Sequence, residues 1–163
     1  PPPRRPSAGT PILRDAPAAV LRHSGEHRAL ASGPRKPRVL VIDDEAPIRN
    51  AVRRFFEGRG WTVDESADGE QALRVLADIP ADHFDVIICD LKMPGVSGME
   101  LYATLSRRQP ALLGRLIFAT GDVASTDAAS FLQQIRCPVL EKPYELRVLA
   151  ETVDRVRSSA AAA

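Results

Sequence analysis

The sequence predicts an α/β fold in which helices cover both faces of a parallel sheet. From Arg38 onward, short apolar runs rich in β-branched residues alternate with segments of helical periodicity, which is the pattern of successive βα units. The run at residues 84–89 is mainly apolar, as expected of a strand that is buried on both faces. Five such units precede Arg157, so we expect a sheet of five parallel strands.

The segments between the expected strands predict five helices, each with one apolar stripe. Two of the helices should begin with capping boxes, at Asp68-Gly69-Glu70-Gln71 and at Ser97-Gly98-Met99-Glu100. The expected strands are residues 39–42, 61–66, 84–89, 116–119 and 139–140. The expected stripes are Ile48, Val52, Phe55 and Phe56; Ala72, Leu73 and Leu76; Tyr102 and Leu105; Ala128, Phe131, Leu132 and Ile135; and Leu146, Leu149, Val153 and Val156.

Residues 1–37 differ in composition from the rest of the chain. They contain eight of the fourteen prolines, seven Lys or Arg, two acids, and no Phe, Trp, Tyr or Met. The other 126 residues contain fifteen Lys or Arg and nineteen acids, so the net charge of +1 conceals a basic tail on an acidic domain. We predict a flexible Pro/Arg-rich linker at residues 1–37, a domain at 38–157 and a disordered tail at 158–163.

Composition also restricts the partners and the compartment that we expect. The arginines of the linker are scattered, with no aromatics or recognition motif among them, so contact with nucleic acid is not expected. No apolar run approaches the roughly 20 residues of a membrane span, and the proline-rich start does not match a secretory signal. We expect a cytoplasmic chain without membrane contact, in which Cys89 and Cys137 are small apolar fillers.

Four of the five expected strands end in a polar residue that can do chemistry. Asp43 and Asp44 follow the first strand, Asp90 the third, Thr120 the fourth and Lys142 the fifth. Because parallel strands share a direction, these side chains should meet at one edge of the sheet. Carboxylates that close repel one another unless a cation joins them, and a hard divalent ion such as Mg²⁺ suits oxygen ligands. Structural alternatives are helix caps for the acids, a strand-end hydroxyl for Thr120 and a solvated charge for Lys142.

These residues resemble the receiver (response-regulator) domains of two-component signalling. The resemblance covers Arg38 to about Arg157. It implies a doubly wound, flavodoxin-like sheet of strand order 2-1-3-4-5, which agrees with the five βα units counted above. It also implies a phosphoacceptor module that catalyses only its own phosphorylation and dephosphorylation. The residues that carry the resemblance, at the family's spacings, are Asp43-Asp44, Asp90, Met93-Pro94-Gly95, Thr120 and Lys142-Pro143.

The resemblance implies how the phosphoryl group would be handled. Asp90 would accept it from a histidine kinase or phosphotransfer domain, in a reaction that depends on positioning and charge compensation. Lys142 would pair with one phosphoryl oxygen, and the Thr120 hydroxyl would hydrogen-bond another. In this family the Lys-Pro peptide is commonly cis, and Lys142-Pro143 permits that.

The resemblance also implies a set of ligands for Mg²⁺. Asp44 and Asp90 would bind the ion directly, and the main-chain carbonyl of Lys92 would be a further ligand. Asp43 would contribute weakly or through water.

Three positions of the chain bear on how the family's switch works here. Receivers usually have an aromatic residue three positions before the site lysine, where this chain has Val139. Any signal should therefore travel by repacking of the fourth and fifth βα loops or by docking at the site itself. Lys92 and Asp122 occupy the positions that, in the family, flank the path of attacking water. Our hypothesis is that these opposite charges pair across the mouth of the site and hinder water.

The position of the domain near the end of the chain suggests a larger parent protein. We expect the carboxyl-terminal receiver of a hybrid histidine kinase, with a stand-alone single-domain response regulator as the alternative. Some receivers also form homodimers through the face of the fourth helix, fifth strand and fifth helix. Three further alternatives are a Mg²⁺-dependent phosphohydrolase, which normally needs an acid where Lys92 stands, a binding-only module, and a dinucleotide-binding domain, which lacks its Gly-rich turn here.

Overall fold

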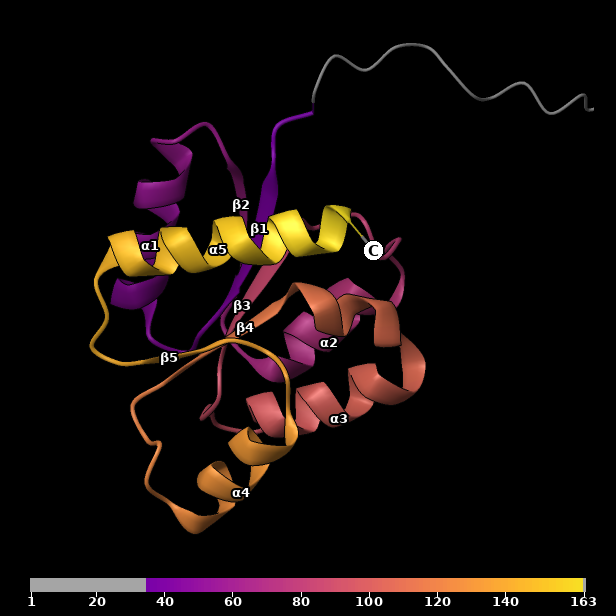
Figure 1. Ribbon diagram of the computed structural model, residues 1–163, viewed down its shortest axis with the longest axis vertical. Coiled ribbons are helices and arrows are strands. Elements are labelled where there is room, and N and C mark those ends of the chain that lie inside the picture. Colours follow the sequence, from indigo (N-terminus) through magenta and orange to yellow (C-terminus); the bar gives the residue numbers. More distant parts are fainter. Residues whose placement is uncertain (1–34, 163) are drawn as a thin grey trace, which may run out of the picture. The chain divides into compact units, whose positions relative to one another are not determined.

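The computed structural model describes residues 35–162, and within them five parallel strands form one sheet of order β2-β1-β3-β4-β5 (Figure 1). This confirms the predicted doubly wound, flavodoxin-like architecture. The strands are β1 Arg38–Ile42, β2 Thr62–Ser66, β3 Val86–Asp90, β4 Leu116–Thr120 and β5 Val139–Glu141. The helices are α1 Ala46–Glu57, α2 Gly69–Ala77, α3 Gly98–Arg108, α4 Thr126–Gln134 and α5 Leu146–Ala161, with a short 3-10 helix, η1, at Pro110–Arg115.

Helices cover both faces of the sheet because the central strands are apolar on both sides. In β1, Val39 and Val41 pack against α1 and α5, whereas Leu40 and Ile42 pack against α2, α3 and α4. Figure 1 shows the two helix groups, with α1 and α5 together and α2 and α3 on the other side. All five residues of β3 are buried. The central strand is thus held between two apolar layers, and only its carboxyl end faces the site described below.

Local capping explains where two of the helices begin. At α3, the Ser97 side chain accepts from the Glu100 N–H, while the Glu100 carboxylate accepts from the Ser97 N–H, which confirms the predicted capping box. At α2, Asp68 accepts from the Gln71 N–H as predicted. The return bond differs, because the Gln71 side chain accepts from the N–H of Ala67 rather than that of Asp68.

One strand, two helix ends and one element needed correction. Strand β3, predicted at residues 84–89, is Val86–Asp90. Helix α4 ends at Gln134, and Ile135 is extended, although it still packs against the core. Helix α5 continues through Ala161, so residues 158–161, which we predicted as a disordered tail, are helical. The Ser158 hydroxyl donates to the Asp154 carbonyl one turn earlier, and alanine favours helix. The 3-10 helix η1 was not predicted.

The described part of the chain begins slightly before the predicted domain. Arg35 contacts the Asp85 carboxylate at 2.8 Å and donates to the Asp82 carbonyl. The ordered contacts of the domain therefore start three residues earlier than Arg38, inside the predicted linker. Residues 1–34 of that linker lie outside the described residues. Within residues 35–162, no helix is long and apolar enough to cross a membrane.

Candidate functional site

The register of the sheet brings four strand ends to one edge. Ile42 lies opposite Cys89, and Asp90 lies opposite Ala119. Thr120 lies opposite Glu141, the residue before Lys142. The residue after β1, the last residues of β3 and β4, and the residue after β5 are consequently neighbours, as predicted from the shared strand direction.

Lys142 is the centre of this cluster. Its Nζ atom lies 2.8 Å from Asp43 Oδ2 and 2.9 Å from Asp90 Oδ2, and 3.6 Å from Glu45 Oε1. The Lys142 side chain is 14% exposed, and those of Asp43 and Asp90 are 4% and 7% exposed. One ammonium group therefore serves two buried carboxylates, which leaves a local excess of negative charge. The Lys142-Pro143 peptide is cis, as expected from the family resemblance.

The backbone holds the second oxygen of each buried carboxylate. Asp90 Oδ1 accepts from the Lys92 N–H at 3.1 Å, and Asp43 Oδ1 accepts from the Glu45 N–H at 2.9 Å. Both are bonds from an aspartate to the backbone two residues further on, which is the pattern of an Asx turn. The turn fixes each carboxylate while its other oxygen stays directed at Lys142.

Burial and charge shift the ionisation of the groups at this edge. Burial raises the pKa of Asp90 above its ordinary value, although the hydrogen bond and charge of Lys142 oppose that rise. Burial works to lower the pKa of Lys142, but its bonds to Asp43 and Asp90 raise it overall. Lys142 is therefore a permanent cation.

The two cysteines match their predicted role as fillers. Both are free, with Cys89 buried and Cys137 half-buried. Burial raises the pKa of the Cys89 thiol strongly and that of Cys137 to about 11. Neither thiol is thus a nucleophile near neutral pH.

Three acids at this edge have the geometry to hold a metal ion. One oxygen from each of Asp43, Glu45 and Asp90 lies within 4.8 Å of the other two. These hard oxygen donors, next to a single cation, fit Mg²⁺. Asp44, which we predicted as a direct ligand, is exposed and stands outside this group. Glu45 was not predicted, although the run of three acids at residues 43–45 was a signal for it.

Thr120 and Asp122 form the opposite side of the site. The Thr120 hydroxyl is buried and exchanges hydrogen bonds with the main chain of Asp122, at 3.2 Å to its carbonyl and 3.1 Å from its N–H. The Asp122 carboxylate pairs with the Lys92 ammonium, as we predicted for these two loops. That contact, followed by bonds from the main chain of Ser125, lowers the pKa of Asp122. Thr120 is within the cluster of strand ends but is bonded to its own loop.

An aromatic cluster, which we did not predict, lies between β4 and the helices α3 and α4. Phe118 and Phe131 are 5.6 Å apart between ring centroids, and Tyr102 is 5.4 Å from Phe131. Val139, at the position of the usual aromatic residue, lies opposite Phe118 and packs against the same core. The position of Phe118, two residues before Thr120, was a signal that β4 itself carries an aromatic residue toward α3 and α4.

This fold and site define a class of protein: a five-stranded α/β module with a buried aspartate, an acidic loop and a lysine at the carboxyl edge of its sheet. The family model described as the response regulator receiver domain matches residues 39–154 of the chain. The chain therefore belongs to the response regulator receiver domain family and is a receiver domain of two-component signalling.

Relatives of this chain include both kinases and transcriptional regulators. Over 85% of its length, the chain is 30% identical to the sensor kinase CckA of Brucella abortus, and it spans 14% of that protein. Over 74% of its length, it is 31% identical to the DNA-binding transcriptional regulator NtrC of Escherichia coli, and it spans 24% of that protein. The chain thus corresponds to a small part of these relatives.

Solved structures agree with the fold. The chemotaxis protein CheY4 of Vibrio cholerae superposes with a TM-score of 0.63 at 28% identity, covering 75% of this chain and 99% of that one. The signal receiver domain of a signal transduction histidine kinase from Syntrophus aciditrophicus gives a TM-score of 0.67 at 24% identity, covering 76% and 91%. The second likeness concerns the fold alone.

Proposed function

We propose that Asp90 accepts a phosphoryl group from the phosphohistidine of a histidine kinase or phosphotransfer domain. The observation that carries the proposal is the single Lys142 ammonium held between the buried carboxylates of Asp43 and Asp90, at 2.8 and 2.9 Å. In this arrangement Lys142 opposes protonation of Asp90 and places a positive charge where phosphoryl oxygens would lie. It is a site built for charge compensation, which is the main requirement of phosphoryl transfer.

The transfer is a displacement at phosphorus. An oxygen of the Asp90 carboxylate forms a bond to phosphorus while the bond from phosphorus to the imidazole nitrogen of the donor breaks, and the imidazole keeps that electron pair. Lys142 neutralises charge on the transferred group. The Thr120 hydroxyl leaves its bonds to the Asp122 main chain and donates to a phosphoryl oxygen, which moves the β4–α4 loop.

Mg²⁺ would be held by Asp90, by the acids at residues 43–45 and by the main-chain carbonyl of Lys92. When bound, it supplies further positive charge for the phosphoryl oxygens. Asp43 and Glu45 have the required geometry with Asp90, and the exposed Asp44 adjoins them. Magnesium titrations of Asp44→Asn and Glu45→Gln, compared with Asp43→Asn, decide which acid of the loop is the direct ligand. The variant that loses most affinity identifies it.

A phosphodonor of low molecular weight tests the function directly. The full chain is incubated with acetyl phosphate and MgCl₂, and intact mass spectrometry should show one phosphoryl group per chain. Asp90→Asn should show none, and EDTA should suppress the reaction. Labelling of Asp90→Asn would overturn the assignment of the nucleophile. Continuous turnover of a phosphate ester would favour a phosphohydrolase instead.

A cleft beside Lys142 supports docking of the donor protein at this face. It measures about 570 Å³ and is apolar over most of its lining, which includes Ile48, Ala51 and Val52 of α1 and Tyr144 and Leu146 after β5. An apolar surface next to a charged site suits a helix that presents a phosphohistidine. Ala51→Glu, at an exposed position of α1, should slow transfer from a phosphohistidine protein. It should leave labelling by acetyl phosphate unchanged.

For the larger context, we propose that this receiver belongs to a hybrid histidine kinase, because a sensor kinase is among the relatives that cover most of the chain. Kinase-domain sequence upstream in the full gene would support this context, and its absence would favour a stand-alone regulator. Pairing of receivers through α4, β5 and α5 is a further proposal from the family resemblance. Sedimentation with and without acetyl phosphate tests whether phosphorylation promotes a dimer.

A further inference from the structure

Arg49, in the first turn of α1, makes a contact with the site that the family resemblance did not assign. Its Nη1 atom donates to the main-chain carbonyl of Asp43 at 2.7 Å. Its Nε atom lies 3.5 Å from Glu65 Oε1 at the end of β2. The side chain is 17% exposed, so the guanidinium is largely shielded from water. Arg49 therefore joins the β1–α1 turn to the edge strand of the sheet.

The Asp43 residue is held at each of its polar atoms. Its N–H donates to the Ser66 carbonyl at 3.1 Å, and its carboxylate accepts from the Glu45 N–H and the Lys142 ammonium. The bond from Arg49 completes this set at the carbonyl, on the peptide that leads into the acidic loop. Loss of that bond frees the peptide to rotate, and such a rotation would move the Glu45 N–H, and the acidic loop with it, away from the Asp43 carboxylate.

Glu65 in turn fixes the guanidinium of Arg49. The second oxygen of Glu65 lies 3.0 Å from Nε of Arg53, one turn further along α1. Arg53 makes no contact with Asp43, although it shares the Glu65 partner with Arg49. The two arginines are therefore a matched pair: both connect α1 to β2, but only Arg49 touches the acidic loop among the contacts of the described residues.

We propose that Arg49 is a positioning residue of the phosphoacceptor site. Through the Asp43 carbonyl, it orients the acids at residues 43–45 toward Lys142 and toward the cation. This inference rests on the proposed function of the site. The sign of the effect separates it from simple electrostatics, because removing a positive charge near acids would by itself strengthen the binding of a cation. Loss of a positioning contact weakens that binding instead.

The test is a magnesium titration of the full chain, in which the backbone amide chemical shifts of the folded protein report Mg²⁺ binding. Arg49→Met keeps the length of the side chain and removes its donors, and we expect Mg²⁺ affinity about tenfold below that of wild type. Arg49→Lys, which can still donate to the Asp43 carbonyl, should restore part of the affinity. Arg53→Met is the matched control and should bind Mg²⁺ as wild type does.

Amide hydrogen exchange gives a second reading that needs neither metal nor phosphate. In EDTA, the Glu45 amide hydrogen should exchange faster in Arg49→Met than in wild type, because the hydrogen bond from that amide to the Asp43 carboxylate should be weakened. Unchanged or tighter Mg²⁺ binding in Arg49→Met would overturn the inference, as would an equal loss in Arg53→Met. If Arg49→Met does not fold, Arg49→Lys carries the test. We then expect its Mg²⁺ affinity to be moderately below that of wild type, and an affinity equal to wild type would contradict the inference.

The outcomes for Arg49 are distinct from those for the proposed function. Failure of wild type to take phosphate at Asp90 would remove the proposed function while leaving the exchange result valid. Phosphorylation of wild type, together with unchanged Glu45 exchange and Mg²⁺ affinity in Arg49→Met, would remove only the role of Arg49.

Discussion

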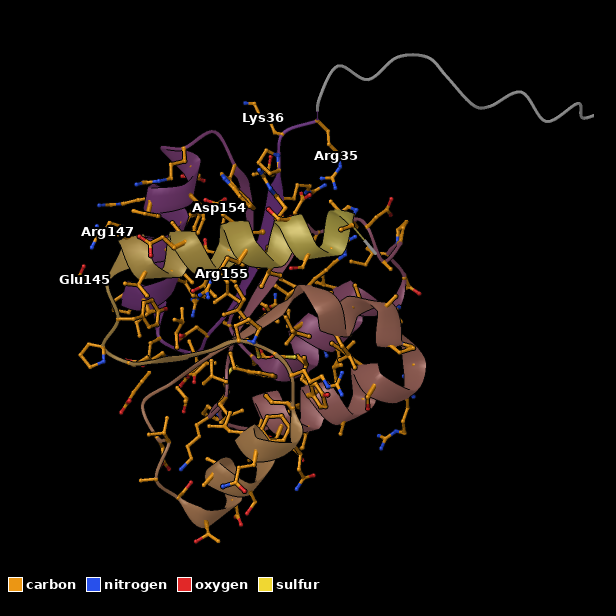
Figure 2. All side chains as sticks on the ribbon, in the orientation of Figure 1. Arg35, Lys36, Glu145, Arg147, Asp154 and Arg155 are labelled. Carbon is orange, nitrogen blue, oxygen red and sulfur yellow. The ribbon has the colours of Figure 1, made fainter. Side chains whose placement is uncertain are left out.

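The two ends of the sheet both carry pairs of basic and acidic side chains, but they use them differently. At the amino end, Arg35 lies 2.8 Å from Asp85, and Arg38 lies 2.7 Å from Asp64. Figure 2 shows Arg35 where the described chain begins, beside the start of β1. At the carboxyl end, the distances from Lys142 to its two carboxylates are nearly the same. Contact distance therefore does not distinguish a structural end from a functional one.

Burial and the balance of charge do distinguish them. The Arg35 side chain is 50% exposed, so water and salt screen its pair with Asp85. Lys142 is largely buried and faces two buried carboxylates, which raises its pKa. At the amino end each cation has its own acid, whereas at the carboxyl end one cation is shared. The unmatched negative charge is what would allow a divalent cation to bind there.

The largest expected effect is on phosphorylation. Lys142→Met should slow labelling of Asp90 by acetyl phosphate by about 100-fold, because it removes a preorganised positive group from the transition state. Arg35→Met, at the opposite end of the sheet, should remain within about twofold of wild type, as expected for an exposed pair. Rates are measured by intact mass at saturating MgCl₂.

A similar loss of rate in both variants would break the comparison, since it would mean that the effect arises from general destabilisation. Thermal unfolding of each variant, recorded under the labelling conditions, shows whether both are folded.

The next effect is on stability. In EDTA, Lys142→Met should lose about 3 kcal/mol of unfolding free energy, because it leaves two buried carboxylates without their cation. Arg35→Met should lose about 0.5 kcal/mol or less. Urea unfolding measures both. Addition of MgCl₂ should return part of the loss in Lys142→Met, and equal losses in the two variants would contradict the distinction by burial.

The sequence was sufficient for the features that depend on strand ends. Asp90 and Lys142 follow apolar runs, and parallel strands bring their ends together whatever the details of packing. The order of the sheet followed from the family resemblance rather than from the strand ends. The pairing of Lys92 with Asp122 was predictable from opposite charges on facing loops.

Features that depend on side-chain direction or on distant contacts were not predictable in this way. Three successive acids follow β1, and only the path of the turn decides that Asp43 is buried and Asp44 exposed. Arg49 meets a main-chain carbonyl and an acid from another strand, so no spacing along the chain reveals it. Ile135 continues the apolar spacing of α4, yet the helix ends before it, because packing against the core does not require helix.

The ionisation of Asp90 gives a third test of the comparison. Its pKa is raised in the folded state, so the folded protein binds more protons than the unfolded one between the unfolded and folded pKa values. Stability therefore falls as pH rises through that window, and the penalty persists above it. Asp90→Asn should be more stable than wild type near neutral pH in EDTA, and this gain should shrink as pH falls toward the ordinary range of aspartate.

Asp85→Asn is the control for this pH test, because Asp85 pairs with the half-exposed Arg35 at the other end of the sheet. It should show no such gain at neutral pH. Urea midpoints across a pH series decide the matter, and a gain for Asp90→Asn that does not depend on pH would show that ionisation is not its cause.

The smallest effect concerns the pair of Lys92 and Asp122. Because this pair is exposed but lies at the functional end of the sheet, it shows whether location or burial determines the effect of a charged pair. This pair lies at the functional end, yet its side chains are 54% and 31% exposed, comparable with 33% and 39% for Arg38 and Asp64 at the amino end. If it hinders water at the mouth of the site, Lys92→Ala should shorten the lifetime of the phosphorylated chain by about two- to fivefold, a modest effect typical of exposed pairs. Decay of labelled protein after removal of the donor measures it.

Asp122→Asn is the matched partner variant, since its amide oxygen can still accept from the main chain of Ser125 while the charge is lost. It should shorten the lifetime as Lys92→Ala does, and the double variant should decay no faster than either, because each change removes the same contact. Added salt should shorten the wild-type lifetime and leave that of the double variant unchanged, since exposed charges are screened. Unchanged lifetimes in both single variants would mean that this pair, despite its location, behaves like Arg35 and Asp85.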